Sequence, residues 1–233
     1  MNAPKTSVLI GCYGDFPDYS LRAVESVLDG CREQEYELLV GCNSCCASTI
    51  KALRLLADSG KIDALIESRR NLNKDRMMRL LIDLAAHPYV LWIDDDSHVL
   101  PGWAELLQEF ISRCAPFDCA GHIFYWHKDD EYRAFLRQRP WYLGENAYLK
   151  IPDHQQRTWF ATGGFFLART EFLRKHDFPD RGMLKRHDDI LLGDLISQHN
   201  GRLIPFDEKI MEVVRISDGD RRGIGEEGYR SLA

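Results

Sequence analysis

A short apolar segment that ends in three consecutive aspartates constrains the fold more than any other part of the chain. Five residues without a charge, Tyr89 to Ile93, are followed directly by Asp94, Asp95 and Asp96. A short, β-rich apolar run bounded by polar and turn residues is typical of a strand that is buried on both faces of a sheet. In an open α/β sheet, ligands bind at the carboxyl ends of such strands. We therefore expect the three carboxylates at a ligand-binding edge.

Three adjacent carboxylates repel one another unless a positive charge lies among them. A hard divalent cation, held by carboxylate oxygens and shared with a phosphate-bearing substrate, is the usual source of that charge. The alternative is a solvated acidic turn in which Asp96 or Ser97 caps the next helix. The segments on either side favour the cation site.

Strand-like and helix-like segments alternate along the first hundred residues. We expect strands at 7–11, 36–40, 62–66 and 89–93, and a helix after each of the first three, the third at 74–85. This alternation predicts a mostly parallel sheet with right-handed crossovers. The polar turns at Tyr13, Asn43, Asn71 and Asp94 then converge on one edge. The chain has neither GxGxxG nor GxxxxGK[ST], so the usual dinucleotide and P-loop phosphate sites are not expected.

The second half of the chain predicts further elements around an irregular insertion. After Pro101 we expect a helix that buries Trp103, Leu106, Leu107, Phe110 and Ile111, and then one strand at 119–126. Residues 127–159 mix charges with aromatic residues, which form either a small core of their own or a platform for a sugar or another ring. Residues 159–168 are extended, with a kink at Gly163-Gly164 of the kind that marks a bulge or a ligand close to the backbone. A short helix at 171–175, a helix opened by Asp188-Asp189 and a strand at 202–206 follow.

Size and composition predict one soluble α/β domain. The 233 residues carry a net charge of -6, which gives no overall signature of nucleic-acid or anionic-membrane binding. No run approaches the ~20 apolar residues of a membrane span. The first residues lack the apolar region of a secretory signal, so we expect a cytoplasmic protein. We divide the domain into a nucleotide half at 6–100, an acceptor half at 101–207 and a tail at 208–233.

Seven cysteines, an odd number, are expected to be free thiols in a cytoplasmic protein. The cluster Cys42-Asn-Ser-Cys45-Cys46 contains a CxxC, which leaves a redox or a zinc role as alternatives. A structural zinc site needs four ligands, usually from two such pairs, and the other close pair, Cys114 and Cys119, has looser spacing.

Taken together, these segments resemble the GT-A glycosyltransferases of family 2. Residues 7–13 resemble the opening strand and turn of that family, 21–28 the following helix, 36–40 the second strand, and 89–96 the strand that carries the DxD motif. Residues 163–173, Asp188-Asp189 and Leu192-Gly193 resemble the acceptor half. The chain departs from the family at Cys42-Asn43, where two aspartates are usual, in the helix at 74–85, which lacks the common Ala-Arg-Asn start, and in having no late histidine for the metal.

The resemblance implies an inverting transfer of a sugar from a nucleotide-diphosphate sugar, most simply a UDP-sugar, to an acceptor hydroxyl. It places Mn²⁺ or Mg²⁺ on Asp96 and Asp94 and makes Asp189 the catalytic base, with Asp188 as its orienting partner. It also implies two sets of binding residues. The nucleotide-sugar would contact Cys12, Tyr13, Asn43, Arg70, Asn71, Asp94 and Asp95, and the acceptor or its sugar would contact Trp159, Gly163 and Gly164.

Other basic residues are candidates for the diphosphate, namely Lys74, Arg79 and the pair Arg221-Arg222. The acceptor is left open among a glycan, a lipid carrier, a small metabolite, a protein and a modified nucleic-acid base, and so is the oligomeric state. Two other functions fit the same sheet: a nucleotidyltransferase, which lacks its usual basic loop here, and a non-catalytic nucleotide- or carbohydrate-binding protein.

Overall fold

The first half of the chain alternates strands and helices as its sequence predicts. The structure is a computed structural model of the whole chain, and it describes residues 5–29, 36–150, 152–180, 188–206 and 210–213. The elements of this half are β1 (Thr6–Tyr13), α1 (Pro17–Asp29), β2 (Tyr36–Asn43), α2 (Ala47–Asp58), β3 (Ala64–Ser68), α3 (Lys74–Leu84) and β4 (Tyr89–Asp94). Each strand is followed by a helix that returns the chain to the start of the next strand, which produces parallel pairing.

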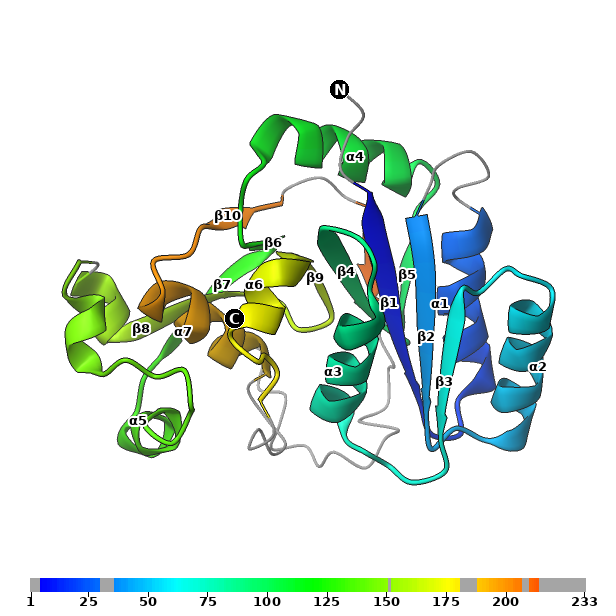
Figure 1. Cartoon of the computed structure of the whole chain (residues 1–233), viewed down its shortest axis with the longest axis horizontal. Coiled ribbons are helices and arrows are strands. Elements are labelled where there is room, and N and C mark those ends of the chain that lie inside the picture. Colours follow the sequence, from blue (N-terminus) through cyan, green and yellow to red (C-terminus); the bar gives the residue numbers. More distant parts are fainter. Residues whose placement is uncertain (1–4, 30–35, 151, 181–187, 207–209, 214–233) are drawn as a thin grey trace.

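A seven-stranded sheet with the order β10-β6-β9-β4-β1-β2-β3 forms the centre of the molecule. The second half of the chain contributes β6 (Cys119–Gly121), β9 (Phe165–Arg169) and β10 (Leu203–Pro205). Only β9 runs antiparallel to its neighbours, β4 and β6, whereas the other paired strands are parallel. The predicted mostly parallel α/β sheet is thus confirmed. The carboxyl ends of β1 and β2 lie at the lower edge in Figure 1.

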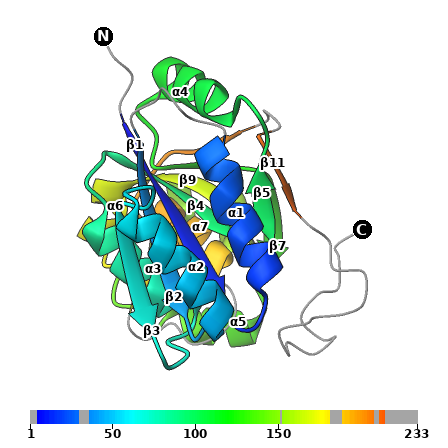
Figure 2. The same cartoon turned by 90° about the vertical axis from the view of Figure 1, so that its right-hand side faces the viewer.

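Helices cover both faces of the sheet, because alternate strand residues point to opposite sides. Val8 and Ile10 pack on one side with α1, α2 and α4 (Trp103–Cys114). Leu9 and Trp92 pack on the other side with α3, α6 (Thr170–Lys175) and α7 (Asp188–Gln198). Figures 1 and 2 show the two helical layers. Within the described ranges, no helix combines the length and apolar character that crossing a bilayer requires.

Two expectations for the second half are wrong in detail. Residues 119–126 form two strands, because β7 (Ile123–His127) leaves the main sheet after β6 and pairs with β8 (Arg157–Ala161). The break follows Gly121, where a Cβ would lie 2.7 Å from the Cβ of Ala161, so the chain must turn away. Leu106 is 37% exposed because the helical repeat of α4 places it at the edge of the buried stripe.

Ser97 does not cap a helix. It begins β5 (Ser97–Val99), which pairs with β11 (Met211–Val213), and α4 starts after Gly102 in a left-handed conformation. Strands of three residues are too short to produce a periodic signal in the sequence, which explains why neither was predicted.

The aromatic insertion has a core of its own. It contains α5 (Asp130–Leu136) and two short 3₁₀ helices, η1 (Glu145–Lys150) and η2 (Pro152–Gln155). Tyr132, Leu136, Trp141 and Tyr148 are buried and join the hydrophobic cluster under α7. Of the two interpretations of this aromatic stretch, the small core therefore applies to these residues, whereas Tyr125 and Trp159 do not belong to it.

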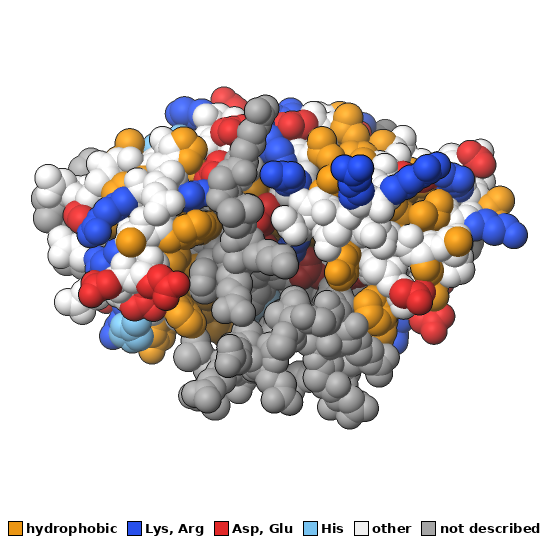
Figure 3. Space-filling view, turned by 90° about the horizontal axis from the view of Figure 1, so that it is seen from below, with side chains coloured by type: hydrophobic (Ala, Val, Ile, Leu, Met, Phe, Trp, Pro, Cys, Tyr) orange, Lys and Arg blue, Asp and Glu red, His pale blue; other side chains and the backbone are white. Residues whose placement is uncertain are grey.

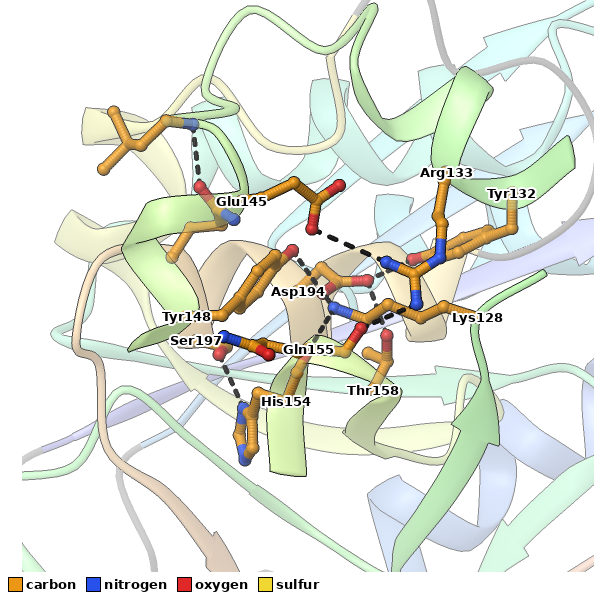
Figure 4. Close-up of polar contacts among 12 residues, drawn as sticks. Lys128, Tyr132, Arg133, Glu145, Tyr148, His154, Gln155, Thr158, Asp194 and Ser197 are labelled. Carbon is orange, nitrogen blue, oxygen red and sulfur yellow. Dashed lines mark hydrogen bonds and ion pairs between the residues drawn. The ribbon is translucent and has the colours of Figure 1, made fainter. Parts of the chain in front are cut away.

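A fully buried aspartate fastens the insertion to α7. Asp194 accepts hydrogen bonds from Lys128 Nζ at 2.6 Å, Tyr132 Oη at 2.5 Å, Tyr148 Oη at 2.7 Å and Thr158 Oγ1 at 2.6 Å (Figure 4). The Lys128 ammonium also lies 3.6 Å from the centroid of the Tyr148 ring. Every acceptor position of the carboxylate faces a donor, which is the condition under which a buried charge is tolerated. Residues from α5, η1 and β8, together with Lys128 directly after β7, thereby share one partner on α7.

Close packing of α7 on β8 makes Gly193 a sharp test of the fold. A Cβ on Gly193 would lie 2.2 Å from the carbonyl oxygen of Trp159, which is backbone and cannot rotate away. We expect Gly193→Ala to lower the free energy of unfolding by about 3 kcal/mol, at the upper end of overpacking costs. Urea denaturation would measure it, with Lys51→Ala on the exposed side of α2 as the control. An unchanged midpoint for Gly193→Ala would show that α7 does not pack as described.

Candidate active site at the carboxyl edge of the sheet

The polar turns after β1, β2, β3 and β4 meet at one edge, as predicted. Tyr13 and Asn43 are register partners at the ends of β1 and β2, and Gly11 is the partner of Asp94 on the other side of β1. The Asn43 side chain is buried, donates from Nδ2 to Asn71 Oδ1 at 3.2 Å and accepts from the Leu72 amide at 2.7 Å. The turn after β3 is therefore held against the turn after β2. In the view of this edge in Figure 3, acidic and basic side chains are interspersed.

The three consecutive aspartates have three different environments, because a strand end turns successive side chains in different directions. Asp94 is half-buried, and its Oδ1 accepts from Trp92 Nε1 at 2.8 Å. Asp95 is buried and accepts from the Tyr13 amide at 3.0 Å and from Ser20 Oγ at 3.2 Å, so it fixes the turn after β1. Asp96 is half-buried. The structure thus separates a structural Asp95 from two acids nearer the surface.

The Lys74 ammonium lies between the two halves of the site. It is 3.0 Å from Asp94 Oδ1 and 3.2 Å from Asp188 Oδ2, and it donates to the carbonyl oxygen of Gly163 at 2.8 Å. Burial lowers the pKa of Lys74, but the charges of Asp188 and Asp94 outweigh burial, so the net shift is upward. Lys74 therefore carries a positive charge at every physiological pH, which offsets the repulsion between the strand acid and the acid pair of α7.

Asp189 faces the kink between β8 and β9. Its Oδ2 accepts from the Gly163 amide at 3.2 Å, and its Oδ1 accepts from the Ile190 amide at 2.8 Å. A Cβ on Gly163 would lie 3.2–3.3 Å from atoms of the Asp189 side chain, which explains why this position favours glycine. Asp94 is on the other side of the kink, since its amide donates to the Gly164 carbonyl oxygen at 3.0 Å.

Burial and repulsion give two carboxylates of this site unusual acidities. Burial, together with the charge of Asp188, raises the pKa of Asp189 to about 6, and Lys74 opposes that rise. Burial also raises the pKa of Asp75 to about 7, with Asp188 again adding to the effect. A carboxylate with a pKa near 6 is mostly ionised at neutral pH and is still basic enough to accept a proton.

Other predicted residues lie outside this cluster. The Cys12 side chain is fully buried in the core, so burial prevents the predicted contact between its thiol and a nucleotide. Arg79 pairs with Asp83 and Asp177 rather than facing the site. Arg70 and Asn71 are exposed at the edge itself. Trp159 is on β8, four residues before Gly163, and Arg221-Arg222 lie outside the described residues.

The cysteines of the CxxC segment are free. Cys12 and Cys42 are neighbours across β1 and β2 and are both buried, whereas Cys45 and Cys46 are partly exposed. Burial raises the pKa of the Cys12 thiol, and hydrogen bonds from Ser48 and Thr49 lower the pKa of Cys46. Among the residues that the structure describes, no three side chains of the usual ligand types form a preassembled metal cluster.

The acids at the edge nevertheless suit a hard divalent cation. Mg²⁺ is commonly held by one or two protein carboxylates together with substrate phosphates and water, so it needs no complete protein cage. Asp94 and Asp96 flank the end of β4 and supply oxygen ligands of that type. Burial raises the pKa of Asp94 because it disfavours the ionised carboxylate, and the charge of Lys74 partly opposes this effect. A bound cation beside Asp94 would oppose it further.

Comparison with known proteins decides the family. The family model described as glycosyl transferase family 2 matches residues 7–177, well over half of the chain. The chain belongs to glycosyltransferase family 2. No curated protein gives a significant match to the family 2 chain.

Solved structures agree with this assignment in fold. TarS 1-349 of S. aureus is similar at a TM-score of 0.60 and 16% identity, over 89% of this chain and 59% of that one. The mannosyltransferase PcManGT of Pyrobaculum calidifontis, in complex with GDP-Man and Mn²⁺, has a TM-score of 0.61 at 13% identity, over 95% and 59%. TarS 1-349 with UDP-GlcNAc has a TM-score of 0.57 at 16% identity, over 89% and 57%. At such identities the likeness establishes the GT-A fold, and the family 2 chain spans less than two thirds of each of these proteins.

Two features of this family 2 site were not recognised from the sequence. Lys74 was expected at the diphosphate, but it also pairs with Asp188, which is 114 positions away in the sequence, and no local pattern reports such a contact. Asp75 was not singled out in the sequence, yet it is only 7% exposed and is affected by the charge of Asp188. No local pattern in the sequence reports this burial.

Proposed function

We propose that this family 2 protein is an inverting glycosyltransferase that moves a sugar, most simply a hexose, from a nucleotide-diphosphate sugar to an acceptor hydroxyl. The observation that carries the proposal is the convergence of Asp94 and Asp189 on opposite sides of one kink, with Lys74 between them. A donor site at Asp94 and a proton acceptor at Asp189 would then lie side by side. The family match supports this class of reaction, and the bound nucleotide-sugars named for TarS and PcManGT support the class of donor.

The donor half would be formed by the turns after β1 to β4. Asp96 and Asp94 would hold Mg²⁺ or Mn²⁺, which when bound supplies a Lewis acid for the charge of the leaving diphosphate. Lys74 contributes a second positive charge in the same place, and exposed Arg70 lies at the same edge. A UDP-sugar is the donor we propose. The cytoplasmic location expected from the sequence stays a prediction.

The acceptor half would provide the base. An alcohol has a pKa far above neutrality, so a positioned carboxylate must take its proton as the oxygen attacks. Asp189 is oriented for this by two backbone amides, those of Gly163 and Ile190, and Lys74 stabilises its ionised form. Attack from the face opposite the leaving group inverts the anomeric carbon. The proton ends on Asp189, and the nucleotide diphosphate leaves with the electron pair of the broken bond.

Asp189→Asn tests the base. The amide keeps the size of the carboxylate but cannot accept a proton, so we expect turnover to fall by roughly 10²- to 10⁴-fold. Nucleotide binding, measured by calorimetry, should stay unchanged because Asp189 is not among the donor residues. Asp188→Asn is the matched comparison, and it should lower turnover less than Asp189→Asn does. Full turnover by Asp189→Asn would show that another group is the base.

The pH dependence of turnover tests the electrostatics. Because the base must be ionised, turnover should rise with pH through the pKa of Asp189, which lies at about 6. Lys74 opposes the upward shift, so Lys74→Gln should move this acidic limb to higher pH, whereas Lys74→Arg keeps the charge and should leave it nearly in place. The measurement is kcat at saturating donor from roughly 2 pH units below to roughly 2 pH units above the expected midpoint. If the midpoint of the pH–turnover profile is the same in Lys74→Gln as in the wild type, Asp189 is not the group whose ionisation controls turnover.

A thermal-shift screen tests the donor and the cation. UDP, GDP, CMP, dTDP and their sugars would each be added with and without Mn²⁺, since a ligand that binds only the folded state raises its apparent stability. We expect a Mn²⁺-dependent increase in Tm with one nucleotide, lost in Asp96→Ala. Asp58→Ala on α2 is the control. If no nucleotide shifts the Tm, the donor site as proposed does not exist.

A further inference from the structure

The two-stranded ribbon β7–β8 has one face that the core does not use. Alternate residues of a strand point to opposite sides. Thr158 and Phe160 point toward α7. Thr158 donates to Asp194 (Figure 4), and Phe160 packs against Gly193. The opposite side carries two cross-strand pairs, Tyr125 with Trp159 and His127 with Arg157. We call these four residues the aromatic face.

The side chains of the aromatic face form one layer. The rings of Tyr125 and Trp159 have centroids 5.3 Å apart, and Tyr125 and His127 have centroids 5.5 Å apart. The Arg157 guanidinium lies 4.9 Å from the centroid of the Tyr125 ring. Asp153, from η2, accepts from Trp159 Nε1 at 2.7 Å and lies 3.7 Å from Arg157. Tyr125 is nevertheless 42% exposed, so the layer is ordered by its own contacts without being covered.

The aromatic face combines exposed rings with charged and polar side chains, and this combination favours one class of ligand. Exposed aromatic rings in a preorganised layer usually mark a binding surface. A partner that is purely apolar would desolvate Arg157, His127 and Asp153 without offering them new hydrogen bonds, which is costly. A sugar ring has a face of C–H bonds and a rim of hydroxyl groups. Its face can lie on Trp159 or Tyr125 while its hydroxyls bond to the three polar side chains at the edge of the rings.

The position of the face relative to the kink indicates which sugar would lie there. β8 leads directly into Gly163, whose amide holds Asp189. Trp159 is four residues before Gly163, at most about 13 Å along the chain. Its side chain lies on the side of β8 opposite to Thr158, which faces α7, the helix that carries Asp189. A sugar on the aromatic face would therefore not be the one that reacts. It would be a more distant unit of a longer acceptor.

The far end of the ribbon opens onto a polar surface. Gln155 and Gln156, which directly precede Arg157, help to line an open cavity of about 410 Å³ together with Arg133, Arg137, Glu145 and Asn146. Arginine, amide and carboxylate side chains are donors and acceptors suited to hydroxyl-rich ligands. The chain next to the aromatic face thus presents polar side chains at the start of β8.

We infer that the acceptor is an oligosaccharide or polysaccharide and that the aromatic face binds a unit of it distant from the reacting hydroxyl. This rests on the proposed function, because the inference concerns the acceptor of the proposed sugar transfer. Among the acceptors that the sequence leaves open, the inference selects a glycan.

Binding to a panel of immobilised glycans of defined structure, from monosaccharides to hexasaccharides, tests the inference. The variants are Trp159→Ala and Tyr125→Ala, and the matched control is Phe124→Ala, an aromatic residue that is 47% exposed on the neighbouring position of β7. We expect wild type and Phe124→Ala to bind a longer glycan, and the two face variants to bind it about tenfold more weakly. Circular dichroism of each variant checks that it is folded.

Three results would overturn the inference: no glycan of the panel binds the wild type, the face variants bind as well as the wild type, or Phe124→Ala weakens binding as strongly as they do. The nucleotide thermal shift, run on the same four proteins, separates this failure from that of the proposed function. A Mn²⁺-dependent nucleotide shift without glycan binding removes only the glycan acceptor. Glycan binding without any nucleotide shift removes the transferase.

Discussion

One ammonium group holds the two halves of the site together. Without Lys74, the carboxylates of Asp94 and Asp188 would approach each other with no charge between them, in surroundings where burial makes like charges repel strongly. With Lys74 in place, the end of β4 and the start of α7 are joined through a single cation, which also binds the carbonyl oxygen of Gly163. The geometry around Asp189 depends on that carbonyl, because the amide of the same glycine donates to Asp189. Donor and acceptor sides are therefore coupled electrostatically and not only by the backbone.

The buried Asp194 performs a comparable function further along the same helix. Asp194 is five residues after Asp189 on α7, and its four hydrogen bonds come from separate segments of the insertion. An apolar cluster could bury as much surface, but it would not specify which residues of the insertion face α7. Removing any single donor would leave a buried charge incompletely bonded, which is costly. The insertion is thus fixed relative to α7, and the aromatic face on the outer side of β8 is fixed with it.

The sequence predicted those parts of the molecule that have a local signature. The alternation of strands and helices up to Asp94, and the convergence of the turns after β1 to β4, follow from periodicity and from the direction of parallel strands. Strands of three residues such as β5 and β11 have too few positions for a pattern, and the exit of β7 from the main sheet depends on contacts of Gly121 with a strand 40 residues later. The single acid in the apolar stretch Ile190–Ile196 was a sign of burial, but its partners lie 36 to 66 residues away and share no motif. Pairings between distant side chains require the fold itself.

The turn after β2 illustrates how a departure from a family pattern changes a residue's role. Where two aspartates are usual, this chain has Cys42 and Asn43, and both side chains are buried. Two aspartates buried there would have to be ionised beside each other, whereas a thiol and an amide carry no charge. Asn43 directs its amide group to Asn71 and to the Leu72 backbone, so little of it remains for a ligand. The prediction that Asn43 contacts the nucleotide thus becomes a prediction that it acts through the exposed Asn71, whose position it fixes.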